Sequence, residues 1–134
     1  MAANTQPIFA LVPETKIVTV TAATTDRTGA TTTNLVELLT AGADGTKITQ
    51  IGAKAAGTNA ATLVLIFITD TAGANPKLFD EIVLNAITAS TTVTSQRNVT
   101  AYSDLQLKSG QKVLVGTTVA ITDGVNVFAI KGDY

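Results

Sequence analysis

Two adjacent carboxylates, Asp80 and Glu81, are the first residues of this chain that could do chemistry together. A carboxylate pair can hydrolyse a glycosidic bond when both side chains face one site. The surrounding segment 78–84, LFDEIVL, alternates as a strand does, and neighbouring residues on a strand point to opposite faces. We therefore interpret Asp80 and Glu81 as separate, solvated charges of an edge or a loop.

Three aspartates, Asp44, Asp70 and Asp123, lie in the stretches AGADGTK, TDTAGAN and ITDGVN, which are reminiscent of short calcium loops. A calcium loop of the EF-hand type needs the spaced ligands D-x-D-x-D-G and a closing Glu, and none of the three has them. Asp also forms turns by accepting hydrogen bonds from nearby backbone N–H groups. The sequence thus favours turn-forming roles, and we predict no metal site and no cofactor.

The chain contains 0 His, 0 Cys and 0 Trp. The absence of His and Cys excludes Ser-His-Asp and Cys-His arrangements as well as zinc sites of the usual kind. Neither a Walker A stretch nor a G-x-G-x-x-G stretch occurs. We therefore predict that the protein is not an enzyme and has no catalytic residues.

One region, residues 97–112, brings an aromatic ring and several cations together, namely Arg97, Tyr102, Lys108 and Lys112. Such a patch could bind carbohydrate or nucleic acid, but aromatic residues make up only 4% of the chain, so stacking platforms are few. The net charge of -1 offers no attraction to nucleic acid or anionic lipid. We interpret the region as a solvated strand and loop, and expect neither a nucleic-acid nor a membrane partner.

The composition points to a single domain whose surface is partly covered by neighbours. At 134 residues the chain is the size of one domain. Charged residues are 14% of it, against about 25% in an ordinary soluble domain, and the mean hydropathy is +0.34. A core-rich monomer is the alternative, but a weakly charged surface favours an assembly. The N-terminus lacks the features of a signal peptide, so we expect the protein to stay in the cytoplasm until it joins a larger structure.

Alternating β-branched residues and frequent turns predict an all-β fold, a single-domain antiparallel β-sandwich of jelly-roll type. The apolar run 63–68 predicts a strand covered on both faces, and it forms a hairpin with 78–84 across a turn containing Gly73 and Asn75. Asp123-Gly124 signals another hairpin, and the spacing of isoleucines near Gln50 predicts a bulge.

Eight or nine strands are expected. Their approximate ranges are 7–12, 16–22, 35–40, 46–55, 61–70, 77–84, 90–101, 111–119 and 125–131. The stretch 34–41, NLVELLTA, is the one helical candidate, which Asn34 could cap and Gly42 could end; a strand is favoured because the stretch holds under three turns. The predicted core consists of Leu63, Leu65, Phe67, Ile82, Leu84, Val113, Val115, Val127 and Ala129.

The N-terminal residues 1–13 are predicted to be an arm or an edge strand, and residues 14–134 the β-sandwich domain. Prolines restrict a strand to an edge, and soluble monomers seldom expose large apolar patches. We therefore expect the arm to pack on a neighbouring molecule. Its predicted contact residues are Pro7, Ile8, Phe9 and Leu11. An edge strand folded on its own core is the alternative.

Stretches spread over nearly the whole chain resemble a family of small β-sandwich structural proteins of tailed bacteriophages. They are NTQPIFALVP, TTDRTGATTTNLVELLTAGADGTKITQIGAKAAGT, LVLIFITDTAGANPKLFDEIVL, LQLKSGQKVLV and VNVFAIKGDY. These motifs consist of turns and core residues, and the family pattern contributes no reactive residues. The resemblance implies a virion component.

Within that family, the resemblance implies a capsid decoration, or cement, protein that stabilises the head of a tailed phage. It implies a trimer on the capsid surface, bound to the major capsid protein after assembly in the host cytoplasm. The arm would then contact either a second copy of this chain or the capsid. The alternative is a β-sandwich module of a tail or head fibre that binds a glycan of the host surface, which would favour more exposed aromatic residues.

Overall fold

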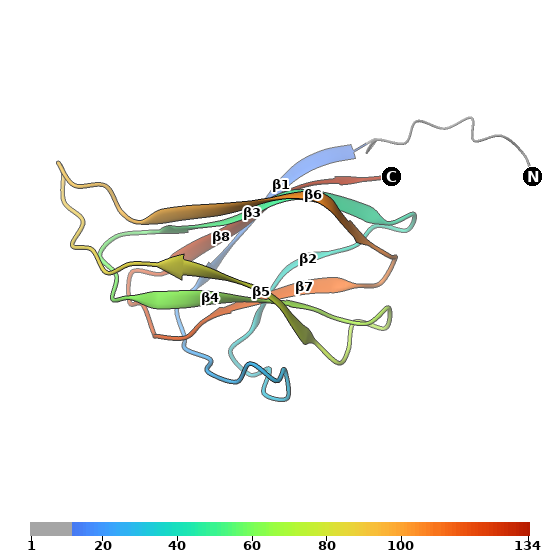
Figure 1. Ribbon diagram of the computed structural model, residues 1–134, viewed down its shortest axis with the longest axis horizontal. Coiled ribbons are helices and arrows are strands. Elements are labelled where there is room, and N and C mark those ends of the chain that lie inside the picture. The colour runs from blue at the N-terminus through green and yellow to red at the C-terminus, as the bar shows by residue number, and fades with distance from the viewer. Residues whose placement is uncertain (1–11) are drawn as a thin grey trace, which may run out of the picture.

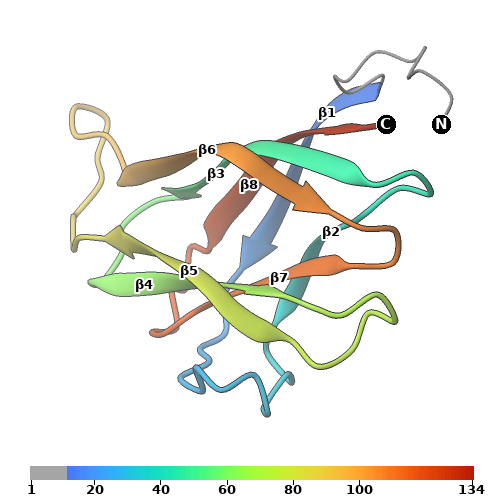
Figure 2. The same cartoon turned by 45° about the vertical axis from the view of Figure 1, so that its right-hand side comes forward.

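The computed structural model describes residues 12–134, which form two packed antiparallel sheets (Figures 1 and 2). Its strands are β1 (Val12–Val20), β2 (Val36–Thr40), β3 (Thr46–Ala55), β4 (Thr62–Ile68), β5 (Lys77–Leu84), β6 (Arg97–Leu107), β7 (Lys112–Thr117) and β8 (Val125–Asp133). The all-β sandwich predicted from the sequence is confirmed. None of the described residues belongs to a helix that could cross a membrane.

Each sheet has four strands, and most neighbours in a sheet are far apart in the chain. Sheet A has the order β1-β8-β3-β6, and sheet B has the order β2-β7-β4-β5. The antiparallel pairs β1–β8, β2–β7, β3–β6 and β4–β5 are nested, as in one long hairpin, and successive pairs lie in alternate sheets. Only β4–β5 is a local hairpin, and it was predicted. Its turn has Gly73 at φ 75° and Asn75 at φ 53°, a conformation that these two residue types tolerate.

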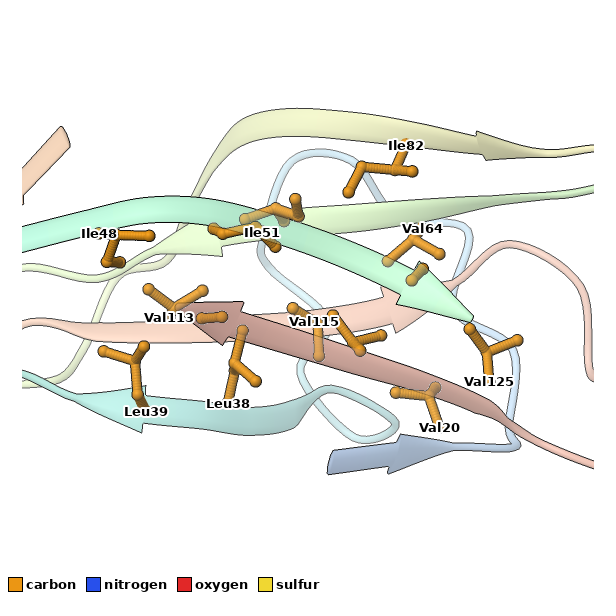
Figure 3. Close-up of a cluster of buried hydrophobic side chains, with 14 of the residues drawn as sticks. Val20, Leu38, Leu39, Ile48, Ile51, Val64, Ile82, Val113, Val115 and Val125 are labelled. Carbon is orange, nitrogen blue, oxygen red and sulfur yellow. The ribbon is translucent and has the colours of Figure 1, made fainter. Parts of the chain in front are cut away.

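Aliphatic side chains from both sheets meet in a layer between them (Figure 3). Ile48 and Ile51 point inward from sheet A, while Val64, Val113 and Val115 point inward from sheet B. The predicted core residues that are at most 1% exposed are Leu65, Phe67, Ile82, Leu84, Val113, Val115, Val127 and Ala129. Leu63 is a correction: it is only half-buried, because it lies at the start of β4 beside Val83, which is 50% exposed.

Strand β4 is covered on both faces, as its apolar run predicted. Val64 and Ile66 face the other sheet and belong to the central core cluster. Leu65 and Phe67 point the opposite way and are nevertheless 0% exposed. Their cover includes residues 21–35, which we call the covering segment and which runs beneath sheet B in Figures 1 and 2.

The covering segment crosses the outer face of sheet B from β7 to β5. Gly116, Leu65 and Glu81 are register partners across β7, β4 and β5. At one end of this row, Thr24 lies so close that a Cβ on Gly116 would be 2.5 Å from its Cγ2 atom. At the other end, the guanidinium of Arg27 contacts the carboxylate of Glu81. Leu65 therefore lies under the middle of the crossing.

Two other predictions about local structure are confirmed: one concerns a strand and the other a bulge. The range 35–40 is a strand, β2, rather than a helix. A register shift between Ile48 and Gln50 interrupts the pairing of β3 with both of its neighbours, where a bulge was expected.

The strand predicted at 90–101 is instead β6, displaced toward the C-terminus at 97–107. Residues 90–93 form a local turn, in which the Ser90 hydroxyl accepts hydrogen bonds from the backbone N–H groups of Thr92 and Val93. Val93 remains 42% exposed, so this stretch has no apolar face that pairing in a sheet would bury.

The turn at Asp123-Gly124 forms, but the hairpin predicted there is wrong. Gly124 has φ 85°, and its N–H donates to the Ile121 carbonyl at 3.0 Å. The flanking strands lie in different sheets: β7 is paired with β2 and β4, and β8 with β1 and β3. Because both edges of each strand are occupied, β7 and β8 cannot pair, and the connection crosses between the layers with Ile121 buried in the core.

Candidate assembly surface

The residues predicted to make assembly contacts, Pro7, Ile8, Phe9 and Leu11, lie outside the described residues. The predicted strand 7–12 also falls outside them except for Val12. The described chain begins at the first residue of β1, where Val12 pairs with Asp133 and Pro13 with Gly132. The surroundings of β1 are therefore the described surface to which the N-terminal segment is joined.

Strand β1 is an edge of sheet A, and its side chains are more exposed than those of the strands that pair on both sides. Within residues 12–134 it pairs along one side only, with β8 over nine residue pairs. Its exposed apolar side chains include Val12, at 56%, and Ile17, at 61%. An edge strand presents unpaired backbone N–H and C=O groups, which another chain can use. Pro13 removes one donor at the start of the strand but leaves the rest of the edge available.

The outer face of sheet A carries a row of apolar side chains that starts at β1. Ile17, Phe128, Gly52 and Val99 are register partners across β1, β8, β3 and β6. A Cβ on Gly52 would lie 2.5 Å from the Cζ atom of Phe128, so the missing side chain makes room for the ring. Next to this row, Ile130 is 40% exposed. We call Ile17, Val99, Phe128 and Ile130 the sheet A patch.

A polar cluster fixes β1 to the rest of the sheet. The Lys131 side chain is only 3% exposed, and its ammonium lies 3.3 Å from a Glu14 oxygen and 3.0 Å from an Asp133 oxygen. Asp133 also accepts a hydrogen bond from the Thr46 hydroxyl at 2.6 Å. Lys16 lies 3.5 Å from Glu14. The cluster therefore connects β1, β8 and β3 at one end of the sandwich.

The Lys131 ammonium and the Asp133 carboxylate stay ionised at neutral pH. Burial lowers the pKa of Lys131, but hydrogen bonds to Asp133 and Glu14 outweigh it, so the pKa is raised above its usual value. The hydrogen bond from Thr46 and the nearby Lys131 ammonium hold the pKa of Asp133 below its usual value. A lysine held in its protonated form is not a nucleophile or a base. The geometry thus gives the cluster a structural role, which is to hold the edge strand in place.

The adjacent carboxylates of β5 face opposite sides, as predicted, but they are half-buried and paired rather than fully solvated. Asp80 accepts a hydrogen bond from the Tyr102 hydroxyl at 2.7 Å, and Glu81 contacts Arg27. Asp70 is a turn former, as predicted: it accepts hydrogen bonds from the N–H groups of Ala72 and Ala74. Among residues 12–134, no three His, Cys, Asp or Glu side chains are grouped so that they could hold a metal.

The residues of the candidate basic patch occupy different parts of the fold. Arg97 begins β6, and Lys108 follows its end. Lys112 begins β7 and forms an ion pair of 2.9 Å with Glu37. Tyr102 lies apart from these cations, at the corner between β5 and β6, where its ring contacts the ring of Phe79.

Sequence reasoning missed the sheet A patch. The signal was present in residues 125–130, VNVFAI, where apolar residues occur at odd and at even positions and therefore on both faces of one strand. Only Val127 and Ala129 were assigned to the core, and they do face it. Phe128 and Ile130 point to the other face, which residues 12–134 leave partly exposed.

No protein-family model matches the chain, and no curated protein sequence matches it significantly.

Proposed function

We propose that this chain is a structural protein of a tailed-bacteriophage virion. In this proposal it is a decoration protein that binds the outer surface of the head, contacts the major capsid protein and assembles as a homotrimer. The observation that carries the proposal is the exposed edge strand β1 together with the sheet A patch. Ile17, at 61% exposure, belongs to both.

The resemblance to small phage structural proteins supports the class of function, because it extends over nearly the whole chain. The surface chemistry supports the mode of action. An edge strand can accept a strand from a neighbour through backbone hydrogen bonds, while exposed apolar side chains add contact area. The N-terminal segment enters the fold at the same strand, so one surface would combine all three contributions.

The polar side chains also fit a mechanical role better than a catalytic one. The buried Lys131 holds strands together, and Asp70 organises a turn. A decoration protein must stay folded while it reinforces a shell, and such bonds serve that requirement.

We also propose that the sandwich is a jelly roll. The support is the nesting of the pairs β1–β8, β2–β7, β3–β6 and β4–β5, with successive pairs in opposite sheets. A long hairpin that is rolled up gives this arrangement, which is the topology of many virion proteins built from eight strands.

The proposal is tested by quantifying this chain in purified, fractionated particles by mass spectrometry with labelled peptide standards. A decoration protein is expected in the head fraction, in many copies and in a fixed ratio to the major capsid protein. Heads stripped of the chain should lose heat resistance and regain it when purified protein is added back. A few copies found only in the tail fraction would contradict the proposal and would favour a fibre module.

A further inference from the structure

Two strand irregularities from opposite sheets meet at the corner between β5 and β6. In the pairing of β4 with β5, Ile66 faces Asp80 and Phe67 faces Leu78, so Phe79 is an extra residue on β5. A bulge of this kind bends a strand and turns the extra side chain in a new direction. Phe79 is accordingly 44% exposed although it sits within a strand.

The second irregularity lies on β6, the edge strand of sheet A. Ile48 of β3 faces Leu105, whereas Gln50 faces Ala101. Thr49 therefore lies opposite the three residues 102–104, which have no partners in the regular ladder. Bulges are frequent beside binding sites, because they aim side chains that a regular strand could not aim.

The two irregularities bring an aromatic pair together. The rings of Phe79 and Tyr102 have their centroids 5.7 Å apart and are tilted by 49°. The Tyr102 hydroxyl donates a 2.7 Å hydrogen bond to Asp80, which is held on β5 beside Phe79. Burial and this bond raise the pKa of Tyr102, so its hydroxyl keeps the donated proton over the accessible pH range. The Phe79 ring is thus a supported platform with an exposed side.

Two shallow hollows include Phe79 in their lining. One, of about 400 Å³, is lined by Phe79 with Ile68, Asn75 and Lys77 among others. The other, of about 360 Å³, is lined by Phe79 and residues 101–105. Among the described residues, neither Lys77 nor Asp104 takes part in an ion pair. Each hollow therefore combines the Phe79 side chain with a charged group that forms no ion pair among the described residues.

We propose that this corner, defined by Phe79, Tyr102, Asp104 and Lys77, is a binding site for a neutral carbohydrate. A pyranose ring has a C–H face that packs on an aromatic ring and a rim of hydroxyls that donate to carboxylates. The Phe79 ring offers the first contact, and Asp104 and Ser103 offer the second. Two hollows that share Phe79 fit a chain of two or more sugar units.

The local charge and the bulges argue against the other ligands that stack on aromatic rings. Nucleic acid needs cations to neutralise its phosphates, but Asp80 and Asp104 outnumber the single Lys77 at this corner. A peptide added as a strand needs a regular edge, and the bulges on β5 and β6 interrupt it. A neutral sugar requires neither a cationic patch nor a regular edge. The site is independent of the sheet A patch, so it goes beyond the structural role proposed above.

The test is to screen the full chain against an array of neutral oligosaccharides, including bacterial cell-surface glycans. Positive sugars are then titrated by two-dimensional NMR. Binding should shift the resonances of residues 77–80 and 101–105. Phe79→Ala should weaken the affinity by about tenfold or more, the scale of a well-packed aromatic contact, while Phe79→Tyr retains it. The matched control is Val83→Ala, which truncates an apolar side chain of the same strand that is 50% exposed, against 44% for Phe79, and should leave the affinity unchanged.

Several outcomes would overturn the proposal. These are no binding to any neutral oligosaccharide at millimolar concentration, equal binding by Phe79→Ala that is still folded, or a preference for single-stranded DNA or a peptide. Attachment of the Phe79→Ala protein to phage heads is measured in parallel. It should be unchanged, which separates a failure of this site from a failure of the decoration role.

Discussion

The outer faces of the two sheets carry similar apolar side chains but differ in how far these side chains are buried. On sheet B, Leu65 and Phe67 are 0% exposed, and the covering segment 21–35 contacts that face at Gly116 and Glu81. On sheet A, Ile17 is 61% and Ile130 is 40% exposed. Because both faces are built from strands of the same sandwich, the alternation of side chains along a strand does not explain why the exposed fractions differ.

The difference in exposure indicates which face of the molecule would gain from contact with a neighbouring molecule. Burial of apolar surface contributes about 25 cal/mol for each Å² removed from water. The centre of sheet B gains that contribution within residues 12–134, whereas the sheet A patch does not gain it from these residues. Within residues 12–134 the outer face of sheet A is thus more open than the centre of sheet B, although Val83 at the edge of sheet B is 50% exposed. An open apolar face is the arrangement expected of an assembling component.

Leu65→Ala should produce the largest effect, because it removes a side chain enclosed by the core and the covering segment. We expect a loss of about 2–5 kcal/mol in the free energy of unfolding, measured by urea denaturation. Ile17→Ala on sheet A is the matched control and should change the stability of the isolated molecule by less than about 0.5 kcal/mol. Equal losses for the two variants would mean that the two faces do not differ as described.

A glycine pair offers a second contrast. In Gly116→Ala the new Cβ would lie 2.5 Å from Thr24 Cγ2 and 3.0 Å from Leu35 Cδ2, so the covering segment must move. Overpacking of this kind costs about 1–3 kcal/mol. In Gly52→Ala the new Cβ would lie 2.5 Å from Phe128 Cζ and 2.8 Å from Val99 Cγ2, and both of these half-buried side chains lie on the outer face, where they can move toward solvent.

We therefore expect Gly52→Ala to lower the thermal midpoint less than Gly116→Ala. It should instead weaken self-association, since it displaces a residue of the sheet A patch. A calorimetric scan at low protein concentration, followed by sedimentation analysis at high concentration, measures both quantities. If Gly52→Ala proves the more destabilising variant of the isolated chain, sheet A is the more constrained face and the comparison fails.

Deletion of residues 1–11 should affect assembly rather than folding. The deletion keeps all of β1, including Val12, so pairing with β8 is preserved. We expect the truncated protein to keep its thermal midpoint but to lose trimers and binding to phage heads, as judged by sedimentation and co-purification. Unfolding of the truncated protein, or assembly with unchanged affinity, would show that the arm hypothesis is wrong. Ile17→Asp, which alters β1 itself, is the companion variant and should also lose trimers.

The two outer faces also show what the sequence can and cannot reveal. The run 63–68 predicts a strand with two buried faces, because no polar residue interrupts it. What covers the second face could not be predicted, since residues 21–35 resemble an ordinary polar loop and act through contacts such as Arg27 with Glu81. The bulge that exposes Phe79 was also missed, because regular alternation was assumed through residues 78–84, and pairing with β4 decides where an extra residue falls.

The smallest predicted effect concerns the pH dependence of the covering segment. The Asp26 carboxylate accepts hydrogen bonds from the Thr28 hydroxyl at 2.5 Å, from the Thr28 N–H at 2.8 Å and from the Thr31 N–H at 2.8 Å. These bonds lower the pKa of Asp26 from 3.8 to about 2. Because the folded state favours the charged form, the stabilisation is present above the unfolded pKa and disappears as the pH falls from 3.8 to about 2.

Asp26→Asn should therefore lower the thermal midpoint slightly at neutral pH and flatten its decline in that acidic interval. Other carboxylates with lowered pKa values, such as Asp70 and Asp133, still give both proteins a common slope, so the informative quantity is the difference between the two curves. Asp104→Asn, which alters an exposed carboxylate away from the covering segment, is the control. Since the covering segment belongs to sheet B alone, the change should leave self-association untouched. If Asp26→Asn weakens trimers while the acid profile stays that of the unmodified chain, then the covering segment itself takes part in assembly, and sheet B is not the closed side of the molecule.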